Sequence, residues 1–86
     1  MTRNEIAEKL QAIVEPYVQD KEAFAGITNE TNLLEDLKID SMNLVDIVLD
    51  SEEAFEIEID DEAVEQMVTV GAAVSVVEER LAKKEN

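Results

Sequence analysis

The chain contains no cysteine and no histidine. Disulfide bonds are therefore excluded, which fits a cytoplasmic location. A histidine general base, a cysteine nucleophile and a zinc site of the usual nitrogen and sulfur ligands are excluded as well. Because these absences remove most routes by which a small protein performs its own chemistry, we expect a protein that is not an enzyme and holds no metal.

Aromatic residues are also scarce, since Phe24, Phe55 and Tyr17 are the only ones. The remaining hydrophobic residues are nearly all aliphatic, so the core can yield to a guest chain. No apolar run approaches the ~20 residues that span a bilayer. The N-terminal residues 1–5 are mostly polar, and we predict neither membrane insertion nor a secretory signal.

Basic residues are scarce as well, since the chain has 7 of them against 22 acidic residues and a formal net charge of −15. Residues 35–65 hold 13 acids and a single base, Lys38. Such a chain is repelled by nucleic acid and by anionic membranes. The acids alternate with apolar residues at helical spacing, which favours a folded helix with an anionic face over a disordered acidic tail. That face suits partners with basic patches.

The apolar spacing predicts a single domain, residues 1–86, built from helices. Thr2 and Glu5 form a capping box at the start of the first helix, and Pro16 is expected to kink or end it between Ala12 and Glu15. Residues 19–40 are predicted to form a long loop pinned by apolar residues, with a helical turn at 33–37. One face of the first helix carries Ile6, Leu10, Ile13, Val14, Tyr17 and Val18.

The second half of the sequence predicts three further helices. The second helix runs from about Ser41 to about Glu56 with Asp40 as its N-cap. An extended connector with inward isoleucines, a short helix at residues 61–66 and a last helix capped by Thr69 follow. The fold class is therefore an all-α bundle of three longer helices, one short helix and a long first loop. The expected inner face of the second helix comprises Met42, Val45, Val48, Leu49 and Phe55.

Ser41 lies between Asp40 and Met42, where the long loop enters the acidic helix. Helix capping is the ordinary role of an Asp-Ser pair before an apolar run. A functional serine would need an exposed hydroxyl, a rigid helix to present it and carboxylates that steer a basic enzyme toward it. The sequence is compatible with all three, and a helix N-terminus also favours a phosphodiester.

Five segments carry a shared pattern, and they are Leu37–Met42, Val45–Asp46, Glu52–Ile59, Asp61–Glu62 and Thr69–Val74. In these segments, and over nearly its whole length, the chain resembles the acyl carrier proteins. The resemblance implies a four-helix acyl carrier fold and a 4′-phosphopantetheine arm on Ser41. A phosphopantetheinyl transferase would supply that arm from coenzyme A with Mg²⁺, and the terminal thiol of the arm would carry acyl groups.

The resemblance also implies which residues meet partner enzymes, such as the transferase and the acyl-transferring or condensing enzymes of fatty-acid, lipid or polyketide synthesis. The family's acidic second helix is its recognition surface. Val48, Leu49 and Ile59 would contact partners or line the acyl pocket. The full set of expected contacts is Asp40, Met42, Asp46, Val48, Leu49, Glu52, Glu53, Glu56 and Ile59. We expect a monomer.

Four positions depart from the family pattern and point to a specialised carrier. Lys38 stands where the family usually has glycine, Asn43 where an acid is common and Asp60 where proline is usual. Ser51 replaces a buried leucine, and we predict that its hydroxyl bonds to the backbone of Ile47. A sharper hypothesis is that Ser51 makes the acyl pocket shallower or more polar.

Other functions remain open from the sequence alone. A peptidyl or aminoacyl carrier shares the same attachment chemistry, although such domains tend to be less acidic. A noncatalytic acidic interaction domain would explain the charge without any modified serine. An EF-hand is disfavoured because Phe55 occupies the position in residues 50–61 where the calcium loop needs glycine.

Overall fold

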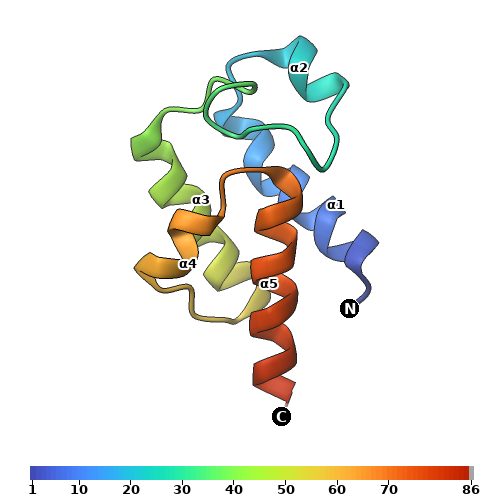
Figure 1. The fold of residues 1–86 in the computed structure, drawn as a ribbon, viewed down its shortest axis with the longest axis vertical. Helices are drawn as coiled ribbons and strands as arrows, with labels where there is room; N and C mark the ends of the chain where they lie inside the picture. Colours follow the sequence, from blue (N-terminus) through green and yellow to red (C-terminus); the bar gives the residue numbers. More distant parts are fainter. Residues whose placement is uncertain (86) are drawn as a thin grey trace.

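A computed structural model describes residues 1–85 and shows a bundle of helices (Figure 1). The all-α prediction is confirmed, and α1, α3 and α5 are the three longer helices. Across the described residues the only β pairing is one isolated bridge between Asn32 and Thr69. The elements are α1 (Arg3–Val14), the 3₁₀ turn η1 (Glu15–Tyr17), α2 (Lys21–Ala25), α3 (Ser41–Phe55), α4 (Asp61–Gln66) and α5 (Val70–Glu85).

Helix α1 begins and ends where its sequence signals place it. The Thr2 amide donates to the Glu5 carboxylate at 2.8 Å, and the Glu5 amide donates to the Thr2 hydroxyl at 3.2 Å, which completes the predicted capping box. The helix stops at Val14 and tightens into η1, which contains Pro16. Its buried stripe packs between α3 and α5. That stripe consists of Ile6, Leu10 and Val14.

The long first loop contains a short helix that the sequence analysis did not foresee. Asp20 caps α2 by accepting a hydrogen bond from the Ala23 amide at 3.0 Å. The predicted helical turn at residues 33–37 is a single turn, in which the Asp36 amide donates to the Asn32 carbonyl at 3.0 Å with helical i to i−4 spacing and the Leu37 amide donates to the same oxygen at 3.2 Å. Leu33 and Leu37 are buried and anchor this segment to the core, as expected.

The loop is also joined to the start of α5 by backbone hydrogen bonds. Leu33 donates to Val68 at 3.0 Å, Val70 to Thr31 at 3.0 Å and Gly71 to Asn29 at 2.9 Å. A side chain at Gly71 would place its Cβ only 3.0 Å from the Asn29 carbonyl oxygen, so glycine permits this close approach. Thr69 caps the helix through the Ala72 amide at 3.1 Å, as predicted.

The inner face of α3 differs from the sequence prediction. Val48 and Phe55 are buried as expected, but Met42, Val45 and Leu49 are 79%, 57% and 56% exposed. The reason is that apolar residues surround more than half of this helix, so spacing alone does not fix its rotation. The residues that α3 buries are Ile47, Val48, Ser51 and Phe55.

The segment after α3 follows the prediction closely. Glu56 ends the helix in the left-handed conformation, with φ at 54°. Ile57 and Ile59 are buried while Glu58 is exposed, so this extended connector does point its isoleucines inward. Asp60 caps α4 by accepting a hydrogen bond from the Ala63 amide at 2.8 Å. The connector and α4 thus close one side of an aliphatic core.

Candidate functional site

Ser41 is the first residue of α3 and its side chain is exposed. Asp40, rather than Ser41, caps the helix, because the Asp40 carboxylate accepts a hydrogen bond from the Met42 amide at 2.9 Å. The Asp40 carbonyl accepts bonds from Asn43 and Leu44 at 2.9 and 3.1 Å. Within residues 1–85 the Ser41 hydroxyl takes part in no hydrogen bond, so capping does not account for it. A free hydroxyl at a helix N-terminus can accept a phosphodiester without loss of a structural bond.

The backbone before Ser41 is held firmly. Ile39 is buried, and its amide donates to the Leu33 carbonyl at 3.3 Å. Lys38 adopts the left-handed conformation with φ at 59°, which L-residues other than asparagine and aspartate rarely occupy. The departure from the family's glycine therefore falls where the backbone would favour glycine. With Ile39 on one side and α3 on the other, the position of Ser41 is well defined.

Carboxylates follow Ser41 along α3. Asp46 and Glu53 are exposed and form no ion pair within the described residues. Glu56 lies 3.9 Å from the Lys84 ammonium. Glu52 differs, because it is half-buried and its carboxylate accepts a hydrogen bond from the Ile59 amide at 2.8 Å.

An exposed apolar stripe runs beside the acids, and we define it as Met42, Val45 and Leu49. These residues share one face of α3 because they are three and four positions apart. Val45 was missing from the predicted contacts, and its spacing with Met42 and Leu49 was the available signal. Val48 and Ile59 are buried, so they cannot present an apolar surface to a partner without rearrangement.

Asp50 is tied to the N-terminal part of the chain. The Tyr17 hydroxyl donates to the Asp50 carboxylate at 2.9 Å and joins η1 to α3. This hydrogen bond raises the pKa of Tyr17 above its usual value, and burial and the negative charges of Asp50 and Asp46 act in the same direction. Asp50 therefore has a structural partner on the side of α3 that carries Asp46.

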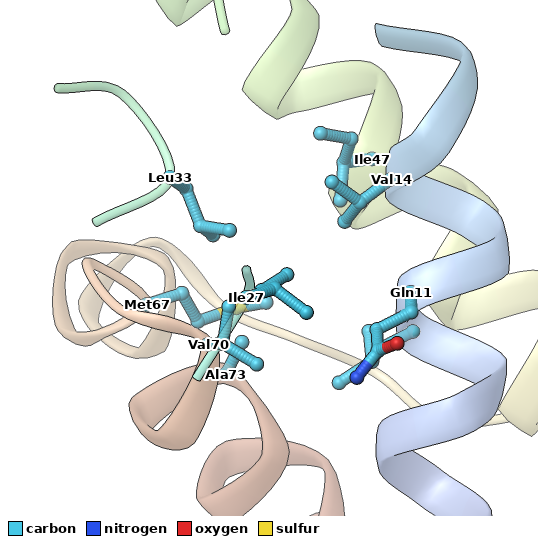
Figure 2. A pocket seen from close by; sticks show the side chains of 9 residues that line it. Gln11, Val14, Ile27, Leu33, Ile47, Met67, Val70 and Ala73 are labelled. Atoms are coloured by element: carbon cyan, nitrogen blue, oxygen red, sulfur yellow. The ribbon is translucent and has the colours of Figure 1, made fainter. Parts of the chain in front are cut away.

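A small apolar cavity lies inside the bundle (Figure 2). Its volume is about 10 Å³, roughly the space for one water molecule. Figure 2 shows the lining side chains pointing toward a common space from the helices and the long loop. The lining residues are Leu10, Gln11, Val14, Ile27, Leu33, Ile47, Met67, Val70 and Ala73.

The sequence-predicted pocket residues do not line this cavity. Val48, Leu49 and Ile59 are absent from its walls, and α3 contributes Ile47 instead. Ser51 is also outside it, and the Ser51 hydroxyl donates to the Ile47 carbonyl at 2.7 Å. The predicted backbone bond of Ser51 is thus confirmed, and the hydroxyl does not add polarity to the cavity wall.

Two other kinds of site are absent from the described residues. Among residues 1–85, no group of three or more acidic side chains is placed to hold a metal ion. No helix in the same range is long and apolar enough to cross a membrane. The candidate functional site therefore consists of Ser41, the acids of α3 and the apolar stripe.

Comparison with known proteins gives a consistent result. The family model for a phosphopantetheine attachment site matches residues 4–77. An acyl carrier protein of Thermotoga maritima is 38% identical over 80 residues, covering 93% of this chain and 96% of the relative. One of Rubrobacter xylanophilus is 40% identical over 79 residues, covering 92% and 95%. The solved structure of the Enterococcus faecalis acyl carrier protein superposes with a TM-score of 0.76 at 34% identity, covering 93% of this chain and 99% of that one.

Proposed function

Because the chain belongs to the acyl carrier protein family, we propose that Ser41 is the residue on which it carries acyl groups. Members of this family hold a covalently attached 4′-phosphopantetheine and are carriers rather than enzymes. The observation that supports Ser41 is its free, exposed hydroxyl at the first position of α3, with the cap supplied by Asp40.

Attachment places a small demand on the chain itself. Ser41 would hold the group through its oxygen as a phosphodiester, which would form as the diphosphate bond of coenzyme A breaks and adenosine bisphosphate leaves. The serine proton would pass to a base that the transferase supplies. Once attached, the group supplies a thiol that holds acyl cargo as a thioester. The exposed start of α3 gives the transferase access, and the helix N-terminus stabilises the new phosphodiester.

The proposed docking face combines the apolar stripe with the exposed acids Asp46 and Glu53. Asp40 and Glu56 extend its negative charge toward the two ends of α3. Carboxylates of this kind speed the encounter with a basic surface, while apolar side chains supply contact area once the surfaces meet. We propose that the partners are a phosphopantetheinyl transferase and enzymes of fatty-acid, lipid or polyketide synthesis. A cytoplasmic location and a monomeric state remain predictions from the sequence.

The apolar cavity is a candidate shelter for the cargo. Its lining is almost entirely aliphatic, so an acyl chain would be favoured over a peptide or amino acid there. Its volume of about 10 Å³ admits no long chain as it stands. Loading therefore requires side chains such as Ile27 and Met67 to move apart.

The direct test is intact-mass spectrometry after incubation with coenzyme A and a broad-specificity transferase. Wild type should gain the mass of one phosphopantetheine, and Ser41→Ala should gain none. Ser75→Ala is a suitable control because Ser75 is also exposed on a helix, and this variant should be modified like wild type. Modification that persists in Ser41→Ala would refute the assignment. Absence of any modification would favour the acidic interaction domain.

A further inference from the structure

Glu52 holds the segment that leads from α3 to α4 through both its side-chain carboxylate and its backbone carbonyl. Its carboxylate accepts a hydrogen bond from the Ile59 amide at 2.8 Å. Its carbonyl accepts bonds from the amides of Glu56 and Ile57, the latter at 3.1 Å. The neighbouring Glu53 is exposed and makes no side-chain hydrogen bond within residues 1–85. Two adjacent glutamates of one helix thus have different surroundings.

The connector, residues 56–60, depends on this support. It leaves α3 through the left-handed Glu56 and then buries Ile57 and Ile59. Figure 1 shows this segment running between α3 and α4. Without the Glu52 carboxylate, the partly buried Ile59 amide would lose its acceptor, and an unpaired amide in such a place is costly. Helix α4 has only six residues and cannot be stable by itself, so it depends on the connector together with its packing against α5.

Lys84 and Arg80 of α5 also reach the connector, but both are weaker tethers, and the Lys84 ammonium is 3.9 Å from the Glu56 carboxylate. The Arg80 guanidinium lies 3.4 Å from the Asp60 carboxylate, whose own side chain is 60% exposed. The Arg80 Nε is buried and has no hydrogen-bond partner among the described residues. Arg80 therefore loses hydration in the closed bundle without full compensation. Among these three side chains, Glu52 makes the shortest contact with the connector.

We infer that Glu52 is a positioning residue: it keeps the connector and α4 closed over the aliphatic core, and it leaves electrostatic docking to Asp46 and Glu53. Its charge is already engaged by the Ile59 amide, so it is less available to a lysine or arginine of a partner. The consequence for cargo rests on the proposed function. The segment after α4 contains Met67, which lines the apolar cavity, so loosening α4 would expose a sheltered thioester to water.

Amide hydrogen exchange on the unmodified protein tests whether Glu52 holds the connector and α4 in place. Glu52→Ala should speed exchange of the Ile59, Ala63 and Val64 amides by about tenfold or more, because a charge-assisted bond is lost. Glu52→Gln keeps an acceptor oxygen, so in this variant the exchange of the same three amides should rise by less than about threefold. Glu53→Gln is the matched control for charge and should leave these amides unchanged. Equal exchange in Glu52→Ala and Glu53→Gln would overturn the inference.

The consequence for cargo is tested on the protein loaded with an octanoyl thioester. Glu52→Ala should hasten cleavage of that thioester by hydroxylamine, and Glu52→Gln should restore most of the protection. The KM of the transferase should rise about two- to fivefold in Glu53→Gln and stay near wild type in Glu52→Gln. If Glu52→Gln raises KM as much as Glu53→Gln does, Glu52 is a docking residue. Failure to load any variant would refute Ser41 carriage but not the exchange result.

Discussion

Single residues near Ser41 carry conformational strain as well as charge. Lys38 holds φ at 59°, two positions before the Asp40 cap of α3. A left-handed conformation costs an L-residue about 1–2 kcal/mol, whereas glycine adopts it freely. The backbone at this position therefore favours glycine, and the lysine is strained there.

We predict that Lys38→Gly raises the free energy of unfolding by about 0.5–1 kcal/mol. The gain is smaller than the full strain because glycine also increases the entropy of the unfolded chain. Urea denaturation measures the change. Lys38→Gln is the control, since it removes the charge and keeps the strain, and it should not reproduce the gain. A lower stability of Lys38→Gly would mean that the lysine side chain outweighs its backbone.

At the scale of the elements, the predictions that were confirmed depend on contacts between residues close in sequence. Caps at Thr2, Asp40 and Thr69 depend on residues close in sequence, and all three appear where they were expected. The Ser51 bond to Ile47 was predictable for the same reason, because it joins positions one turn apart. Local chemistry thus placed the helix ends and the environment of Ser41.

Features that depend on the packing of segments distant in sequence could not be predicted from the sequence. The rotation of α3 was predicted wrongly because both of its faces are apolar, and only contact with α1 and the loop decides that Ile47 is buried. Helix α2 was missed because five residues carry too little periodicity. The bond from the Ile59 amide to Glu52 spans seven residues around a left-handed turn, so Glu52 looked like its neighbour Glu53.

The contact between η1 and α3 gives a pH-dependent prediction. The hydrogen bond to Asp50 raises the pKa of Tyr17, so the folded pKa lies above the unfolded value of about 10. The stabilisation is therefore complete below pH ~10 and is lost as pH rises through the folded pKa. Asp50→Asn should lower the midpoint of tyrosinate absorbance, because the negative charge is removed. Tyr17 is the only tyrosine and tryptophan is absent, so the signal is unambiguous.

An unfolded control fixes the reference for this titration. In denaturant, wild type and Asp50→Asn should share one midpoint, since the hydrogen bond exists only in the folded protein. Glu53→Gln should leave the folded midpoint unchanged, because Glu53 is not among the groups that act on Tyr17. Identical folded midpoints in wild type and Asp50→Asn would remove the proposed tie between η1 and α3.

At the scale of the whole molecule, its charge acts on stability and on docking in opposite directions. The net charge of −15 is confined to a body of 39 × 24 × 18 Å. At 0.01 M salt the Debye length is about 30 Å, so carboxylates repel one another across the bundle, and at 0.1 M it shrinks to about 10 Å. Added salt should therefore stabilise the fold, while it weakens the attraction between the acids of α3 and a basic partner.

The last prediction uses this opposition. Raising salt from about 0.01 to about 0.1 M should raise the Tm and slow modification of Ser41 by the transferase. The double reversal Asp46→Lys with Glu53→Lys changes the formal net charge from −15 to −11. It should raise the Tm at low salt and slow modification already there, because it relieves repulsion and removes steering together. A Tm indifferent to salt would contradict the repulsion, whereas a modification rate indifferent to both changes would show that docking depends on the apolar stripe alone.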